Sequence, residues 1–383
     1  MTESRLTLKN NARCRLKLSV VETVGALLVA ACMAQAQTTR VGSTSAPAAS
    51  PKPLLLEKNE GEQRLWRPEP GEVGLGGFIL KVTPKNSGSQ HLMLVTEDLP
   101  GGAIPTHKHL EQDEIVLIEK GTIHAHVGDQ ERDLHAGGLA FIPMHTWVSF
   151  KNAGTEVVSI VAIFSAPGFE DHLRCESVPA NEKPTVISQA EENECDHQGH
   201  AVYKDRGEKD TSFAAAAEPA AKILLLEKDE GEQRLFRPEP GEVGVGGFNI
   251  KVSPKNNGSR HLVVFTGETV AGDAIPTHKH LEQDEILLIE KGTAHVHVGD
   301  QERDLHAGGM VFIPANTWVG AKITGTEAES DVAIFSSPGF EDHLRCESVP
   351  ANEKPASISR AEENACDHLG HVVYKDRGEV PTN

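Results

Sequence analysis

Two copies of one unit of about 170 residues make up most of this sequence, and this duplication constrains the fold more than any other feature. Residues 54–58 (LLLEK) return as residues 224–228. The fifteen residues from Phe169 to Lys183 are identical to those from Phe340 to Lys354. A period of this length is too long for a solenoid repeat, so each copy is predicted to be a whole domain. The second copy is predicted to be the intramolecular partner of the first.

Composition changes along the chain suggest where the domains begin and end. We predict a signal peptide over residues 1–36, a flexible segment rich in Thr, Ser, Ala and Pro over 37–53, and a first domain over 54–208. An Ala-rich linker follows over 209–222, and the second domain covers 223–379.

The N-terminal segment has the features of an export signal. A basic start precedes an apolar stretch from Val24 to Met33, and Ala34-Gln35-Ala36 is a small-X-small site, which predicts cleavage before Gln37. The alternative is a bacterial lipobox at residues 29–32, with Cys32 as a lipid anchor. The apolar stretch is short of the ~20 residues that a spanning helix needs, so no membrane span is expected. Either interpretation predicts a secreted or periplasmic protein.

The net charge limits the classes of partner. The chain carries 56 acidic and 37 basic residues, for a formal charge of −19 at pH 7. Such a surface repels phosphate backbones, so no nucleic-acid partner is expected. A small-molecule ligand is the expected partner, and an anionic one is still allowed because a bound metal ion can dominate the field inside a pocket.

Each copy has the sequence pattern of short β-strands. Residues 115–118 (IVLI) form a buried apolar run, and residues 122–127 (TIHAHV) alternate polar and apolar before the turn dipeptide at Gly128-Asp129. Glycines and prolines separate the runs, which is typical of a small antiparallel barrel or jelly roll. After Pro167-Gly168, the polar tail of each copy is predicted to be partly helical.

One set of residues in each copy has the spacing of a metal site. His107 and His109 lie at i and i+2, which places both imidazoles on one face of a strand, and Glu114 follows five residues later. The second copy repeats the set as His278, His280 and Glu285. Two imidazoles and a carboxylate leave coordination positions open and suit a divalent transition metal such as Fe, Mn, Ni or Zn. Surface histidines on an exposed strand are the alternative, which the repetition beside a buried strand disfavours.

These residues resemble the first motif of the cupin superfamily, in which a glycine precedes His-X-His, a glutamate and a second glycine. Gly101 to Gly121 fits that motif, and so does Gly272 to Gly292. The second motif is represented by residues 128–152 and 299–314. The resemblance implies an all-β protein with two tandem cupin barrels (double-stranded β-helices, or jelly rolls), each with a short, partly helical C-terminal tail.

Both copies depart from the cupins that use four protein ligands. In those proteins a histidine stands five residues after the Ile-Pro proline, whereas this chain has Val148 and Val319 there. His145 is a candidate substitute in the first copy, but its counterpart is Asn316, and its position on the strand disfavours it. We therefore expect two sites with three protein ligands that are either open or weak.

Four of the six cysteines repeat at one spacing. Cys175 and Cys195 are twenty residues apart, and so are Cys346 and Cys366. In an exported protein this pattern predicts one disulfide in each domain. A Cys₂His₂ zinc site, formed with the histidines that follow Cys195 and Cys366, is the alternative.

The resemblance suggests three functions. The first is a metal-dependent enzyme, similar in layout to quercetinase-like dioxygenases and oxalate decarboxylases, that acts on a small oxygen-rich substrate. The second is a non-catalytic ligand-binding or storage-like protein with vestigial metal sites, and the third is a sugar isomerase or epimerase. The sequence names no general base, although Glu111, Gln112 and Asp113 lie in the segment between the ligands.

Overall fold

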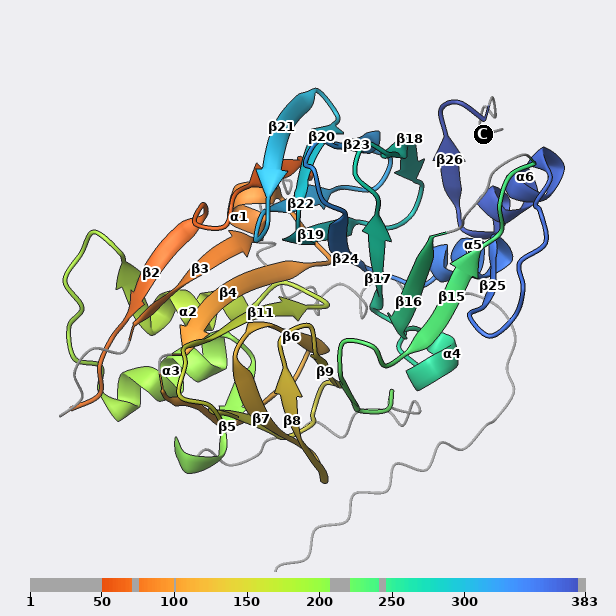
Figure 1. Cartoon of the computed structure of the whole chain (residues 1–383). Coiled ribbons are helices and arrows are strands. Elements are labelled where there is room, and N and C mark those ends of the chain that lie inside the picture. The colour runs from red at the N-terminus through yellow and green to blue at the C-terminus, as the bar shows by residue number, and fades with distance from the viewer. Residues whose placement is uncertain (1–49, 71–75, 100, 207–220, 241–245, 378–383) are drawn as a thin grey trace, which may run out of the picture. The chain divides into compact units, whose positions relative to one another are not determined.

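The computed structural model describes residues 50–70, 76–99, 101–206, 221–240 and 246–377. The predicted signal peptide, with Cys32, lies outside these residues, as do residues 37–49 and 209–220 of the two predicted linkers. Within the described residues the fold is two antiparallel β-barrels with short helices, which confirms the predicted all-β class (Figure 1). None of the described helices has the length and apolar character needed to cross a membrane.

Two sheets form the first barrel. The larger sheet contains, in spatial order, β12 (Ser177–Pro179), β2 (Glu62–Trp66), β3 (Gly77–Val82), β4 (Met93–Leu99), β11 (Val158–Phe164), β6 (Glu114–Lys120), β9 (Leu139–Ile142) and β14 (Leu224–Leu226). The smaller sheet contains β13 (Ala201–Tyr203), β5 (Ala103–His109), β10 (Val148–Asn152), β7 (Thr122–Val127) and β8 (Gln130–His135).

The second barrel repeats this arrangement. Its larger sheet contains β1 (Leu54–Leu56), β22 (Met310–Ile313), β19 (Glu285–Lys291), β24 (Glu329–Phe335), β17 (Val263–Thr269), β16 (Gly247–Val252), β15 (Glu232–Phe236) and β25 (Ser348–Pro350). Its smaller sheet contains β21 (Gln301–His306), β20 (Thr293–Val298), β23 (Val319–Ile323), β18 (Ala274–His280) and β26 (Val372–Tyr374).

The helices are short and connect strands along the chain. They are α1 (Pro84–Ser87), α2 (Phe169–Cys175), α3 (Gln189–Gln198), α4 (Pro254–Asn257), α5 (Phe340–Cys346) and α6 (Arg360–Leu369), with a 3₁₀ turn η1 (Lys204–Arg206). The Ser188 side chain accepts a hydrogen bond from the Glu191 backbone N–H, and the Glu191 carboxylate accepts one from the Ser188 backbone N–H. This capping box specifies in the sequence where α3 begins.

Strand β11 is buried on both faces, which explains its unbroken apolar sequence. Ile160 and Phe164 point into the interior of the first barrel. Val161 and Ile163 point the other way, into a second core that contains residues from both copies, such as Ile334 of β24. Because each central strand has apolar neighbours on both sides, it lacks the polar alternation of a half-exposed strand.

The two copies exchange their first strands. β1 belongs to the first copy but pairs with β22, and β14 belongs to the second copy but pairs with β9. Leu55 accordingly packs in the interior of the second barrel and Leu225 in that of the first. Hydrogen-bonded ion pairs accompany both exchanges. Arg132 contacts Glu230 at 2.6 and 3.0 Å, and Arg303 contacts Glu60 at the same distances.

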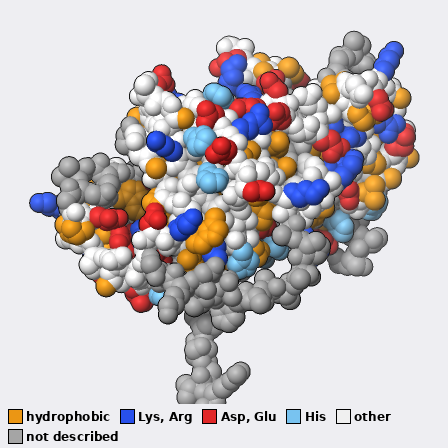
Figure 2. All heavy atoms as spheres, turned by 90° about the horizontal axis from the view of Figure 1, so that it is seen from below, with side chains coloured by type: hydrophobic (Ala, Val, Ile, Leu, Met, Phe, Trp, Pro, Cys, Tyr) orange, Lys and Arg blue, Asp and Glu red, His pale blue; other side chains and the backbone are white. Residues whose placement is uncertain are grey.

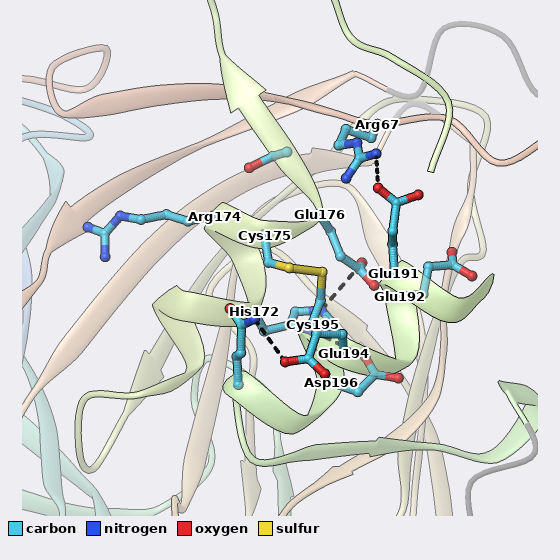
Figure 3. Close-up of a disulfide and its surroundings, with 12 residues drawn as sticks. Arg67, His172, Arg174, Cys175, Glu176, Glu191, Glu192, Glu194, Cys195 and Asp196 are labelled. Atoms are coloured by element: carbon cyan, nitrogen blue, oxygen red, sulfur yellow. Dashed lines mark hydrogen bonds and ion pairs between the residues drawn. A yellow bond between two sulfur atoms is a disulfide. The ribbon is translucent and has the colours of Figure 1, made fainter. Parts of the chain in front are cut away.

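The helical tail of each copy returns to the barrel as an edge strand. The Cys175–Cys195 disulfide joins the end of α2 to α3 (Figure 3), and Cys346–Cys366 joins α5 to α6. After α3 the chain forms β13, which pairs with the end of β5. Both disulfides involve the cysteines of the alternative zinc sites, so those sites are excluded.

Charged side chains of both signs are interspersed over the face shown in Figure 2. Many form exposed ion pairs, such as Lys291 with Glu327 at 3.0 Å. Pairs of this kind contribute little to stability, so the three apolar cores are expected to contribute more.

Candidate metal centres

The first candidate centre lies where β5 ends and β6 begins. His107 and His109 point to one face of β5, as their spacing predicts, and Glu114 is the first residue of β6. All three side chains are buried, and their ligand atoms lie within 4.8 Å of one another. His109 Nε2 is 3.5 Å from Glu114 Oε2.

The second copy builds the same centre from β18 and β19. His278, His280 and Glu285 are buried, and their ligand atoms also lie within 4.8 Å of one another. His280 Nε2 is 3.3 Å from Glu285 Oε2. The structure therefore brings together all six residues that the sequence singled out.

The triads contain buried polar atoms without a hydrogen-bond partner. Among the residues that the structure describes, both ring nitrogens of His109 and Oε2 of Glu114 have no such partner, and the same holds for these atoms of His280 and Glu285. An unsatisfied buried polar atom is costly, and a shared ion would account for one ring nitrogen and the carboxylate oxygen in each triad. The donor set of two imidazoles and one carboxylate fits a divalent transition metal.

Local structure prepares the imidazoles for ligation. His107 Nδ1 lies 2.8 Å from the carbonyl oxygen of Pro105, which favours a proton on Nδ1 and leaves Nε2 free to bind an ion. Burial lowers the pKa of His107 to about 4, of His278 to about 4 and of His280 to about 3. At neutral pH these rings are therefore uncharged, which is the form that binds metals.

Valine occupies the position of the missing fourth histidine. Val148 pairs directly with His107, and Val319 pairs with His278. Both valines are buried in the barrel interiors, beside the triads. His145 does not belong to the group of ligand atoms around His107.

The cupin domain family matches residues 94–164 and 266–332, which span both triads. The chain is a two-domain cupin.

Known proteins share this bicupin layout. A quercetin 2,3-dioxygenase of Bacillus subtilis is 25% identical over 278 residues, which are 69% of this chain and 77% of that enzyme. An oxalate decarboxylase of Lactobacillus farciminis, solved with formate, superposes with a TM-score of 0.51 at 16% identity, over 78% of this chain and 88% of that one. A variant of the Bacillus subtilis oxalate decarboxylase gives 0.50 at 16% identity, over 84% and 89%. At these identities the structural likeness shows the fold alone.

A tyrosine that the sequence analysis did not select lies against each triad of the bicupin. Tyr203 on β13 pairs with His107 across the strands, and their rings stack with centroids 5.1 Å apart. Tyr374 stacks on His278 at 5.2 Å. The chain has only two tyrosines, at the same position of the two copies, and that repetition was the available signal.

A buried charged network lies behind Tyr203. His172 of α2 is 3.3 Å from the Tyr203 hydroxyl, 3.4 Å from Glu176 and 3.2 Å from Asp196 (Figure 3). Although these acidic groups and His172 are close enough to hold an ion, Arg206 contacts both carboxylates, at 2.8 Å in the case of Asp196. The guanidinium supplies the positive charge there. In the second barrel the network consists of His343, Glu347, Asp367, Tyr374 and Arg377.

The acidic residues between His109 and Glu114 contact other parts of the protein. Glu111 pairs with His200 at 3.0 Å. Asp113 accepts from the Met144 backbone and contacts His261 of the other copy at 2.9 Å, and this contact raises the pKa of His261. Asp284 contacts His91 in the reciprocal way at 3.0 Å. These contacts tether the segment before each glutamate ligand, so they indicate positioning roles.

The first triad opens into a large cavity of about 510 Å³. His107 and Glu114 line it together with mostly apolar side chains, including Val95, Leu99, Ile104, Ile160 and Phe164. Glu97 of β4 also lines it, with Oε1 accepting a 2.8 Å hydrogen bond from the Trp66 indole nitrogen. Burial raises the pKa of Glu97 to about 7.

The cavity of the second barrel is smaller, at about 170 Å³. Phe265 stands where the first barrel has Val95, and its ring stacks on Phe335 with centroids 5.8 Å apart. The wall also carries Asp331, which is buried beside Glu329. Burial raises the pKa of Glu329 to about 7 and that of Asp331 well above its usual range.

Proposed function

We propose that this bicupin is an exported, metal-dependent dioxygenase whose first barrel takes a multi-ring, hydroxylated aromatic substrate. The observation that carries the proposal is a triad with unpartnered ligand atoms that opens into an apolar cavity of about 510 Å³. Pockets of this size and character suit drug-sized organic ligands. A small dicarboxylate would leave most of such a cavity unfilled.

The residues of the site have separable tasks. His107, His109 and Glu114 would hold the ion, and Val148 leaves a coordination position without a protein ligand. When bound, a divalent transition metal supplies Lewis acidity and open positions for substrate oxygen or O₂. The Pro105 carbonyl orients His107, while Tyr203 covers one face of its ring.

Charge disfavours a decarboxylase role for the second barrel. Its cavity has the size for a small ligand. Glu285 and Asp331 line it, however, so an anionic substrate would lie beside two acidic side chains. Among the described residues Asp331 and Glu329 are buried together without a neighbouring cation, and their raised pKa values show that this wall already disfavours negative charge, so a further carboxylate would be accommodated poorly. The relation to a quercetin dioxygenase in sequence is consistent with this choice.

Export is part of the proposal. Two disulfides are typical of an oxidising compartment, and the N-terminal segment has the pattern of a signal peptide. Fractionation of cells that express the full chain tests it. A chain that remains in the cytoplasm with free thiols would contradict it.

Elemental analysis and oxygen uptake test the enzymatic function. Protein purified without chelator should contain about two transition-metal ions per chain, one for each triad. With quercetin as the probe it should consume O₂, and His107→Ala/His109→Ala should abolish this uptake. The matched variant His278→Ala/His280→Ala should retain it, because that site faces the smaller cavity. Metal without quercetin-dependent uptake would instead support the non-catalytic, ligand-binding alternative.

A further inference from the structure

Several carboxyl groups line each cavity, and at one cross-strand pair the two barrels place a carboxyl on opposite strands. In the first barrel Glu97 of β4 pairs with Ile160 of β11. In the second barrel the equivalent pair is Gly267 of β17 and Asp331 of β24. The acidic residue has changed strand, while each pair has kept one carboxyl.

The two carboxyls approach the same region of the barrel wall. A Cβ atom added to Gly267 would lie 3.6 Å from Oδ1 of Asp331. The Asp331 carboxylate therefore occupies space next to the position from which a glutamate at residue 267 would project. Both barrels therefore place a carboxyl group in this space, from neighbouring strands.

Each carboxyl also has its own partner. The Trp66 indole donates a hydrogen bond to Glu97. In the second barrel, where Gly267 replaces the glutamate, the counterpart of Trp66 is Phe236, whose side chain has no donor. Asp331 instead shares a hydrogen bond with Glu329, whose counterpart in the first barrel is Val158. The neighbouring residues have changed together with the carboxyl in both barrels.

The carboxyl lies far from the triad along the barrel. Glu114 pairs with Phe164 of β11, and Glu97 pairs with Ile160, four residues farther along the same strand. At ~3.3 Å per residue this separation is about 13 Å. Glu97, His107 and Glu114 nevertheless line one cavity, so a ligand at the metal end can reach the Glu97 carboxyl only if it is long.

Resting on the proposed function, we propose that Glu97 is a specificity-determining residue that binds a hydroxyl group at the end of the aromatic substrate remote from the metal. Asp331, which lies equally far from Glu285 along β24, performs this task in the smaller cavity of the second barrel. A polar group in an apolar cavity is costly unless it is bonded, and such groups discriminate strongly against ligands that lack the matching partner.

Ligand binding without oxygen tests this role separately from turnover. The metal-containing full chain is titrated anaerobically with quercetin and with 3-hydroxyflavone, which lacks the other hydroxyl groups. Glu97→Ala should weaken quercetin binding about 10- to 100-fold, as expected for loss of a hydrogen bond to a charged group. Binding of 3-hydroxyflavone should be nearly unchanged. Glu97→Met serves as a second variant of similar size if the alanine variant does not fold.

The second barrel supplies the matched control. Glu97→Gly/Ile160→Asp copies the arrangement of residues 267 and 331 into the first barrel, and it should recover quercetin affinity to within about tenfold. An equal loss for both flavonols, no loss in Glu97→Ala, or no recovery in a folded, metal-containing transfer variant would overturn the role of Glu97 alone. If the unaltered protein binds neither flavonol, the proposed substrate class falls as well.

Discussion

Val148 lies directly opposite His107 on the neighbouring strand, with its side chain buried in the barrel interior. A histidine at this position would stand beside the triad, because paired residues of adjacent strands project to the same face. We predict that Val148→His tightens metal binding in the first barrel by about tenfold or more, since a fourth protein ligand replaces a solvent molecule. Competition with a chelator measures this, and Val319→His is the matched change. Unchanged retention of metal in a folded variant would contradict the prediction.

Tyr203 is predicted to hold the His107 ring in place mainly by stacking. Tyr203→Phe keeps the ring and removes the hydroxyl that contacts His172, so metal affinity should change little. Tyr203→Ala removes the stack and should weaken metal binding about 10- to 100-fold, as for other groups that orient metal ligands. The same titration on both variants separates the two contributions. Equal losses would assign the effect to the hydroxyl.

Glu97 makes stability depend on pH in a direction that can be worked out. Folding raises its pKa from 4.5 to about 7, so between these values the folded state binds more protons than the unfolded state. The contribution of Glu97 to stability is therefore present below pH 4.5 and is lost as the pH rises to about 7. Glu97→Gln, which does not titrate, should gain up to about 2 to 3 kcal/mol relative to the unaltered protein over this interval. Denaturant unfolding at several pH values measures the difference, and a constant difference would contradict it.

The Cys175–Cys195 disulfide is predicted to matter for the metal centre as well as for stability. Its loop of twenty residues corresponds to about 3 kcal/mol in the loop-entropy treatment. Cys175→Ser/Cys195→Ser should loosen α2, α3 and β13 and thereby separate Tyr203 from His107. Limited proteolysis and metal titration should both change in the first barrel, with Cys346→Ser/Cys366→Ser affecting the second. A loss of thermal stability without a change in metal affinity would show that the tail stays docked.

The strand exchange predicts that a mutation in one copy destabilises the other barrel. Leu55 packs in the interior of the second barrel, so Leu55→Ala should cost about 2 to 4 kcal/mol there. Hydrogen exchange should show reduced protection in β22, its partner strand, rather than in β9. Leu225→Ala should produce the opposite pattern. Loss of protection in the mutated copy's own barrel would contradict the exchange.

Much of the fold and of the triads could be predicted because their signals are local. The alternation in residues 122–127 specifies a strand, and the i, i+2 spacing of His107 and His109 places both rings on one face. The strand exchange could not be predicted, because residues 54–56 and 224–226 are identical and fit either partner equally well. The role of Glu97 depends on which strands pair across the barrel, and no local pattern contains that information. The domain boundaries at 208 and 223 stay predictions.

The exchange of β1 and β14 also has a consequence for how the two halves depend on each other. A single copy produced alone would leave β9 with an open edge and its own leucine strand without a partner, and a second molecule of the same kind would satisfy both. The tandem chain therefore has the arrangement of a symmetric, strand-swapped homodimer whose two halves are joined into one polypeptide. Because the two halves are covalently joined, they stay associated at any protein concentration, although their interiors differ, as at the Glu97–Ile160 and Gly267–Asp331 pairs.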